Sequence, residues 1–456
     1  MISEATVSEP LDAASRGGAF DFGASKLKSR GPTWLSARSG WLGLSGVMAS
    51  GVLIALSAAR TDVLLPESVR PVPGWLAGVF GRGVVDLGLG GLIAVLGLMF
   101  VSYTVAIRSA HQLSARAVLF CVAGLLTVVL LAPPLFSTDM FSYMAYGRIG
   151  ALYGANPYVH GPSAFALDPV YPFIAARWVS TPTAYGPLFT ALSYLVAPLD
   201  VAASALAYKA IAAISSVVIL VVVWNGARLR GLDPVKAVAL VGLNPVIVVF
   251  GVGGGHNDLL MLAILVTGIY GLLRQNGRTS GALIVAATAV KLTAGLLLPF
   301  ALAESARGRG GARSHRAVFG GVCLAAGLAG VLSFAVFGTG PLHLFDTLQD
   351  VQDQGGVNSV PGLLAMLVGL GGLSGVIGVV LNAGFVVILA WLLRRVWIGE
   401  LDWITAAGWA TLALLLTAGL LLPWYVGWLV PLAALSNDRR LLAAAIAMTG
   451  VGLTTL

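Results

Sequence analysis

A polar stretch from Ser137 to Leu188 carries the residues of this chain that are best suited to chemistry. Asp139 lies near its start, and Tyr143 and Tyr146 follow four and seven residues later. If this segment is helical, that spacing places the carboxylate and both phenols on one face. A carboxylate in such surroundings suits a general base that activates a hydroxyl nucleophile. Ser-Thr-Asp is also a common helix start, and the two roles are compatible.

Other groups in the same stretch could contact a substrate. Arg148 could bind a phosphate or clamp Asp139, although a long basic side chain at a membrane edge can equally reach towards lipid headgroups. Tyr185 begins a Tyr-Gly-Pro turn, in which we expect the proline to shape the loop and the phenol to contact substrate. Arg177 precedes a tryptophan and is interpreted as an interfacial anchor.

Three consecutive polar residues, His256, Asn257 and Asp258, follow a run of glycines at the end of an apolar segment. Asn257 or Asp258 could cap the next helix. A cap does not need a histidine, so we assign His256 to donor or phosphate binding and the other two to substrate binding. One histidine and one aspartate without partnered ligands nearby are an incomplete metal set, so we predict neither a metal nor a cofactor.

Two further positions complete the candidate site. Lys291 lies in an otherwise apolar run, where an ammonium group needs an anionic partner or water. A lipid phosphate would be such a partner, although snorkelling to the membrane surface would also satisfy the lysine. Trp424 and Tyr425 follow Pro423 and fit either an aromatic belt or a shelf on which a sugar stacks, so both are predicted substrate contacts.

The composition indicates how these residues are positioned. Hydrophobic residues make up 58% of the 456 positions and charged residues only 10%, with a mean hydropathy of +0.91. Soluble domains carry roughly 25% charged residues, so this chain is predicted to be an all-α, polytopic membrane protein. The net charge of +8 comes from short basic clusters between apolar runs, a pattern typical of cytoplasmic loops and not of nucleic-acid binding.

Apolar runs of about twenty residues are long enough to cross a bilayer. Residues 1–40 lack such a run and are predicted to be a disordered cytoplasmic tail, which leaves 41–456 as the membrane domain. Counting spans from an inside start places an external catalytic loop at 136–200 and a second external loop at 338–359. The second loop is acidic, and we expect it to be solvated, although one of its acids could bind acceptor hydroxyls.

Gly281 to Ala303 needs a different explanation, because a single crossing would place four arginines outside. We interpret it as a broken, re-entrant pair with Lys291 near its tip, since irregular backbone is tolerated where it lines a cavity. All motif-bearing loops then reach one face. This layout predicts a multi-pass protein of the plasma membrane with a cytoplasmic N-terminus and an extracytoplasmic active site.

The order and spacing of several motifs resemble one family. STDMFSYMAYGR, ANPYVHGP and TPTAYGPLF are followed by GVGGGHNDLLM, AVKLTAGLLLP and LLPWY. Together they resemble the polyprenol-phosphate-mannose-dependent α-1,6-mannosyltransferases of lipomannan and lipoarabinomannan biosynthesis in actinobacteria, which are GT-C membrane glycosyltransferases. The resemblance runs from about Leu131 to Tyr425. It implies a GT-C-like bundle of about 11–14 membrane helices, including short re-entrant or interfacial ones.

This resemblance implies transfer of mannose, with inversion, from a β-linked polyprenyl phosphomannose to a lipid-anchored mannan acceptor. It implies that Asp139 is the essential acid of the first external loop and that His256, Asp258 and Lys291 match family positions. The chain departs from many GT-C members because three predicted spans, not one, precede that loop, and because Asp139 has no adjacent acid.

Two alternatives remain open at this stage. A related transferase could move another polyprenyl-phosphate sugar such as arabinose. A secondary transporter could use Asp139, His256, Asp258 and Lys291 as a path for a coupling ion, but its site should lie near the bilayer midplane. Membrane lipids, the lipid-linked donor and the mannoside acceptor are the expected partners, and nucleic acid is not.

Overall fold

The computed structural model describes residues 34–70, 73–74, 76–80, 85–308, 310–353, 359–367, 369 and 374–454. Its described part is built from helices and turns, without a β-strand. The long and medium α-helices are α1 (Trp34–Ser57), α2 (Gly88–Arg108), α3 (Ala115–Leu131), α4 (Asp139–Ala151), α5 (Pro187–Val196), α6 (Val201–Leu229), α7 (Pro234–Gly242), α8 (Asp258–Leu273), α9 (Gly277–Val290), α10 (Leu298–Arg307), α11 (Gly311–Phe337), α12 (Leu344–Asp353), α13 (Val360–Leu367), α14 (Ser374–Ile398), α15 (Trp403–Thr417), α16 (Val430–Ala434) and α17 (Arg439–Thr454).

Five of the described helices are long and apolar enough to cross a membrane: most of α1, then α2, α6, α11 and α14. A sixth span results if α7 is joined to the π-helical segment η6 (Val246–Val252), from which it is bent by 46°. α3, α5, α8 and α15 are shorter apolar helices. The prediction of an all-helical protein with several membrane-length helices is confirmed.

The first helix begins earlier than the sequence pattern indicates. α1 starts at Trp34, within the segment 1–40 that was assigned to the tail, and continues without interruption through Trp41. Residues 1–33 lie outside the described part of the chain. Serines and an arginine mark the polar first turns of α1, so hydropathy alone places the start of the helix too late.

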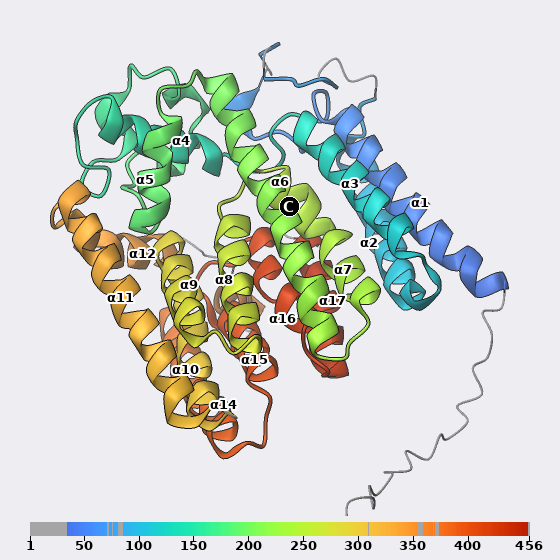
Figure 1. Ribbon diagram of the computed structural model, residues 1–456. Helices are drawn as coiled ribbons and strands as arrows, with labels where there is room; N and C mark the ends of the chain where they lie inside the picture. Colours follow the sequence, from blue (N-terminus) through green and yellow to red (C-terminus); the bar gives the residue numbers. More distant parts are fainter. Residues whose placement is uncertain are drawn as a thin grey trace, which may run out of the picture.

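The predicted loop 136–200 is a helical layer at one end of the bundle. α4 and α5 lie side by side there, next to the first turns of α6 (Figure 1). Gly147 of α4 is required for this packing, because a Cβ atom at that position would lie 2.3 Å from the carbonyl oxygen of Ser193. α4 therefore rests directly on the α5 backbone, outside the membrane-length helices.

The predicted break at Lys291 is present. α9 ends at Val290, Lys291 is extended (φ −149°, ψ 125°), and a 3₁₀ helix, η7 (Leu292–Leu297), leads into α10. The chain then turns back through α10, which precedes α11. This reversal brings Ser314, near the start of α11, against Gly277 at the start of α9. The tip of this helix pair therefore carries the lysine.

The turn Tyr185-Gly186-Pro187 docks on that tip. The amide of Gly186 donates a hydrogen bond to the carbonyl of Val290 at 3.0 Å. A Cβ atom on Gly186 would lie 2.2 Å from the carbonyl oxygen of Ala289, so only glycine permits this approach. The layer of α4 and α5 and the broken pair are thus joined one residue before Lys291.

Candidate active site

Asp139 is the first residue of α4, where the helix dipole faces it with its positive end. Its backbone amide donates to the hydroxyl of Ser137 at 3.1 Å, and its side chain is 17% exposed. The carboxylate oxygen Oδ2 lies 3.5 Å from Nδ1 of His256. The start of α4 therefore presents a nearly enclosed carboxylate that still reaches open space.

His256 is positioned by the glycine run before it. Gly255 adopts φ +65°, and the chain turns so that the amide of His256 donates to the carbonyl of Gly251 at 2.9 Å. A Cβ atom on Gly254 would lie 2.7 Å from the imidazole, so a larger residue there would displace the ring. The buried imidazole stacks on Trp424 with ring centroids 3.7 Å apart. Within the described residues, neither ring nitrogen has a hydrogen-bond partner.

Asp258 and Lys291 form a buried ion pair. The ammonium nitrogen of Lys291 lies 2.8 Å from Oδ1 of Asp258, and the indole of Trp428 donates to the same oxygen at 2.6 Å. Lys291 also lies over the rings of Tyr425 and Trp428, at 4.6 Å and 5.3 Å from their centroids. Removal of water strengthens such contacts, so this pair is a fixed charge centre and not a snorkelling lysine.

The tyrosines of α4 face the same centre. The phenol of Tyr143 donates to Oδ1 of Asn257 at 3.4 Å, and its ring meets Tyr185 edge-on with centroids 4.9 Å apart. The phenol of Tyr146 donates to the carbonyl of Thr181 at 3.0 Å. The predicted spacing of one helical face thus places Asp139 and both tyrosines on the inner side of α4.

Arg148 lies elsewhere. Its guanidinium makes a 2.7 Å ion pair with Asp168 and donates to the carbonyl of Ala197 at 3.1 Å, while the phenol of Tyr153 also donates to Asp168, at 2.6 Å. These contacts tie α4 to the following loop and to the end of α5. The structure does not bring Arg148 into the centre around Lys291, and Arg148 does not clamp Asp139.

Burial raises the pKa of the Asp139 carboxyl to about 6. The positive charges of Lys291 and Arg177 lower that pKa, whereas the negative charge of Asp258 raises it. The resulting value suits a base that is ionised at neutral pH and still binds a proton well. Arg177 was interpreted as a membrane anchor, and its guanidinium does lie over the Trp178 ring at 4.7 Å, but its charge also acts on Asp139.

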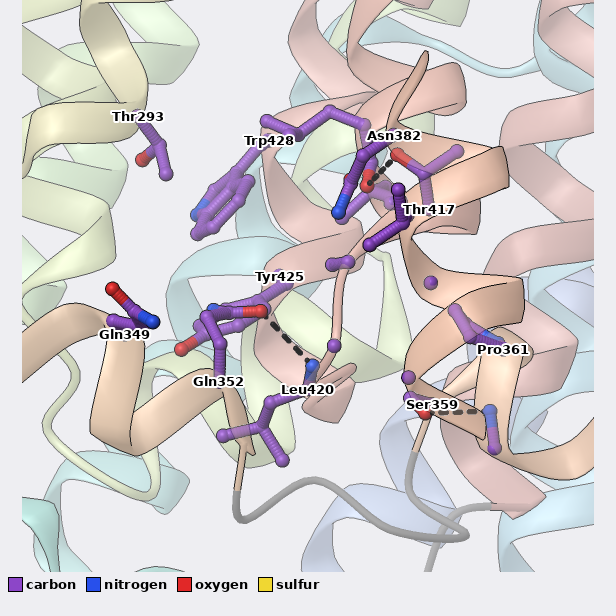
Figure 2. Close-up of a pocket in the computed structure, with 18 residues that line it drawn as sticks. Thr293, Gln349, Gln352, Ser359, Pro361, Asn382, Thr417, Leu420, Tyr425 and Trp428 are labelled. Atoms are coloured by element: carbon purple, nitrogen blue, oxygen red, sulfur yellow. Dashed lines mark hydrogen bonds between the residues drawn. The ribbon is translucent and has the colours of Figure 1, made fainter. Parts of the chain in front are cut away.

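One cavity adjoins the charge centre, and a second lies against the last turns of α9. One, of about 570 Å³, is bounded in part by Tyr425 and Trp428 (Figure 2). The other, of about 250 Å³, is almost entirely apolar and lies between α5, α9 and α11, with Pro187 and Ala289 in its wall. No group of three potential metal ligands occurs among the described residues. The arrangement offers a base, a buried cation and two separate spaces for substrate.

Trp428 is the site residue that the sequence reasoning missed. It follows Tyr425 by one 3₁₀ turn within η10 (Pro423–Trp428), and the two rings stack with centroids 4.3 Å apart. A second aromatic residue at that spacing was available as a signal. In the sequence it stands inside an apolar run, where a tryptophan is easily taken for a lipid contact.

The helical fold and this centre define a membrane protein whose polar chemistry is concentrated where helices are interrupted. The chain belongs to the α-(1→6)-mannopyranosyltransferase family. The family's N-terminal domain matches residues 40–307, and the MptB C-terminal domain matches residues 356–455.

Three relatives illustrate this membership. The α-(1→6)-mannopyranosyltransferase B of Corynebacterium glutamicum is 26% identical over 88% of this chain and 74% of its own length. The α-(1→6)-mannopyranosyltransferase A of Mycobacterium tuberculosis is 32% identical over 59% of this chain and 52% of its own length. A further M. tuberculosis α-(1→6)-mannopyranosyltransferase is 34% identical over 32% of this chain.

The matched part of this chain spans about half of the first M. tuberculosis relative and a quarter of the second. No solved structure matches.

Proposed function

We propose that this protein transfers mannose from polyprenyl phosphomannose to a lipid-anchored mannan acceptor, forming an α-1,6 linkage with inversion. The observation that carries the proposal is that Asp139, a carboxylate whose pKa is raised to about 6, lies within the electrostatic influence of Lys291, a largely enclosed ammonium that is ion-paired with Asp258. Family membership supports mannose as the sugar. The two residues supply the base and the positive charge that displacement at an anomeric carbon needs.

The reaction follows from these roles. An acceptor hydroxyl oxygen attacks the anomeric carbon, and the carboxylate of Asp139 takes the hydroxyl proton. The bond between the anomeric carbon and the phosphate oxygen breaks, and polyprenyl phosphate leaves with the electron pair. The ammonium of Lys291 stabilises the negative charge that develops on the departing phosphate. Because attack and departure occur on opposite faces, a β-linked donor gives an α-linked product.

The apolar cavity between α5, α9 and α11 is suited to the donor lipid. Its wall includes Leu188 and Leu328, and Ala289 in the same wall precedes Lys291 by two residues. A polyprenyl chain in this cavity would therefore place its phosphate near the lysine. Bilayer hydrocarbon would continue the apolar path along α11, which exposes Leu328 and Leu332.

We also propose where the active site lies relative to the membrane and that it needs no metal. The active site faces the extracytoplasmic side of the plasma membrane, the N-terminus is cytoplasmic, and the chain passes the membrane several times. The distribution of basic residues between apolar runs supports this orientation. No metal is required, because the lysine supplies the charge, and a chelator should therefore leave transfer unchanged.

The test uses the full chain purified into lipid nanodiscs. Labelled polyprenyl phosphomannose and a short α-mannoside acceptor are supplied with and without a chelator, in parallel with polyprenyl phosphoarabinose. Mannose transfer that resists the chelator is expected. Transfer of arabinose alone would replace the sugar, and proton- or sodium-coupled uptake into proteoliposomes without any transfer would favour a secondary transporter.

A further inference from the structure

The cavity of about 570 Å³ has a lining that differs from the rest of the membrane domain. Its described wall is formed by α12, α13, α14, α15 and η10, and carries hydroxyl and amide side chains but no charged one. The volume falls within the roughly 300–1,000 Å³ typical of small-molecule sites. Uncharged donors and acceptors beside aromatic rings are suited to a neutral, polyhydroxylated ligand and not to a phosphate.

Figure 2 shows how the polar groups meet the aromatic ones. The amides of Gln349 and Asn382 face the space beside the Trp428 indole. Gln352 also lines the cavity, and its Oε1 accepts a hydrogen bond from the amide of Leu420 at 3.1 Å, which fixes the side chain. The hydroxyl of Thr293 is buried and, within the described part of the chain, unpaired. These groups leave hydrogen-bonding capacity that the protein does not satisfy.

Asn382 is unusual for its position. It lies midway along α14, where it is the single amide or charged side chain between Gly375 and Leu393. A polar side chain in a membrane-length helix usually faces a cavity or a partner, because hydrocarbon cannot satisfy it. The residues of α14 that line the cavity recur at helical spacing on one stripe: Gly375, Gly378, Val379 and Asn382.

The cavity connects with the charge centre through two rings. Tyr425 and Trp428 line the cavity, and both rings also lie beneath the ammonium of Lys291. The indole of Trp428 donates a hydrogen bond to Asp258. A ligand in the cavity would therefore end against the same rings that hold the lysine. The apolar cavity proposed above for the donor lipid is bounded by α5, α9 and α11, and none of these helices contributes a residue to this wall.

We infer that this cavity is the subsite for the acceptor mannoside, in which amides of α12 and α14 bind sugar hydroxyls and Trp428 packs on a sugar face. The inference rests on the proposed function, because it names where that reaction's acceptor binds. It separates the two substrates, with the donor lipid on the α5–α9–α11 side and the acceptor on the α12–α14 side.

Two glycines give an experiment that leaves the fold intact. A Cβ atom on Gly378 meets nothing within 4 Å, so Gly378→Leu adds an apolar side chain to the cavity wall without a clash at its Cβ. Gly384 on the same helix is equally open but is not among the cavity residues, so Gly384→Leu is the matched control. Asn382→Leu removes the amide at similar size. The full chain in nanodiscs is assayed for the KM of a short α-mannoside acceptor, the KM of the donor, and donor hydrolysis.

Gly378→Leu and Asn382→Leu are expected to raise the acceptor KM at least about tenfold. Asn382→Leu removes a hydrogen bond to the sugar, which is worth about a factor of ten, and Gly378→Leu occupies space that the sugar needs. The donor KM and hydrolysis of the donor to free mannose should stay within twofold of native, and Gly384→Leu should match native throughout. An unchanged acceptor KM in Gly378→Leu, or a raised donor KM, would overturn the subsite while leaving the transferase intact.

Direct binding separates this inference from the reaction itself. Saturation-transfer NMR with the free α-mannoside detects occupancy of the cavity whether or not any sugar is transferred. Binding to the native protein and to Gly384→Leu, with loss in Gly378→Leu, would support the subsite even if the donor proved to be another sugar. Absence of mannoside binding to the native protein would overturn it.

Discussion

The interrupted helices around the charge centre differ from the continuous helices α11 and α14. α7 bends into η6, α9 breaks at Lys291, and α15 gives way to η10, and each interruption contributes a site residue or the turn that precedes one. α11 and α14 run 27 and 25 residues without interruption, and only 11% and 6% of their most apolar windows are buried. α11 and α14 leave most of their apolar side chains exposed, whereas α7 and α15 beside the interruptions are packed against other helices.

This difference has a physical cause. A break in a membrane helix frees backbone groups that need partners, so it is tolerated where the protein or a cavity surrounds it. The same enclosure lets a charge pair such as Asp258–Lys291 act at close range. Chemistry and irregular backbone therefore occur together, and α14 reaches the cavity beside the charge centre through the stripe of Gly375, Gly378, Val379 and Asn382.

The largest expected effect comes from the interrupted side. Asp139→Asn keeps the size and the helix start but cannot take the acceptor proton, so the rate of mannose transfer should fall by about 10²–10⁴. Asp62→Asn, at an exposed acid outside the candidate site, is the control and should retain the native rate. Single-turnover transfer in nanodiscs measures both. Equal rates for the two variants would remove Asp139 from the chemistry.

The next effect tests the buried ion pair. Lys291→Met removes the positive charge that stabilises the departing phosphate and leaves Asp258 without its cation. The rate of transfer should therefore fall by about 10²–10³. Breaking a buried pair typically costs about 3–5 kcal/mol, so the Tm should also drop. Arg395→Met, which breaks an exposed pair with Glu400, should cost less than about 1 kcal/mol. Similar Tm values for the two variants would contradict the enclosed pair.

A smaller effect concerns how Asp139 is held. Lys209 is buried within α6, and its ammonium donates to the carbonyls of Ala132 and Pro133, which lie shortly before Asp139 in the chain. Lys209→Met leaves both carbonyls unpaired, at about 1–3 kcal/mol each, and should lower the transfer rate about tenfold. Thermal unfolding and initial rates are compared with Lys236→Met, an exposed control. Native values in Lys209→Met would show that this anchor is dispensable.

The pH dependence is the mildest perturbation. The base must be ionised, and the pKa of Asp139 is about 6, so transfer should be nearly constant above pH 7 and fall towards tenfold per unit below pH 6. Single-turnover rates between pH 5 and 8 record this limb. A profile that stays flat to pH 5 would mean that the carboxyl retains the pKa of an ordinary aspartate.

The sequence was sufficient to predict the site residues that are polar and stand in apolar segments. Asp139, His256, Asp258 and Lys291 are polar residues in apolar surroundings, which cannot be solvated singly, and the structure brings them together. The break at Lys291 followed from the charges that a single crossing would have exported. These features depend on local composition, which a sequence displays directly.

Other features depend on partners that are distant in the chain. The sequence could not show that Arg148 pairs with Asp168 and not with a phosphate, because Asp168 lies twenty residues away in a loop without periodicity. The 570 Å³ cavity joins Gln349, Asn382 and Trp428, which are scattered over three segments. Trp428 itself looks like a lipid contact until its indole is seen to donate to Asp258.

Azide can test whether Asp139 serves as a base. Azide is already an anion and attacks carbon without losing a proton, so it needs no base. Asp139→Ala in nanodiscs, given polyprenyl phosphomannose, should transfer almost no mannose to the mannoside acceptor but should form α-mannosyl azide and release polyprenyl phosphate. Acceptor transfer at the native rate, or a folded variant with native Tm that cleaves no donor even with azide, would contradict the assignment.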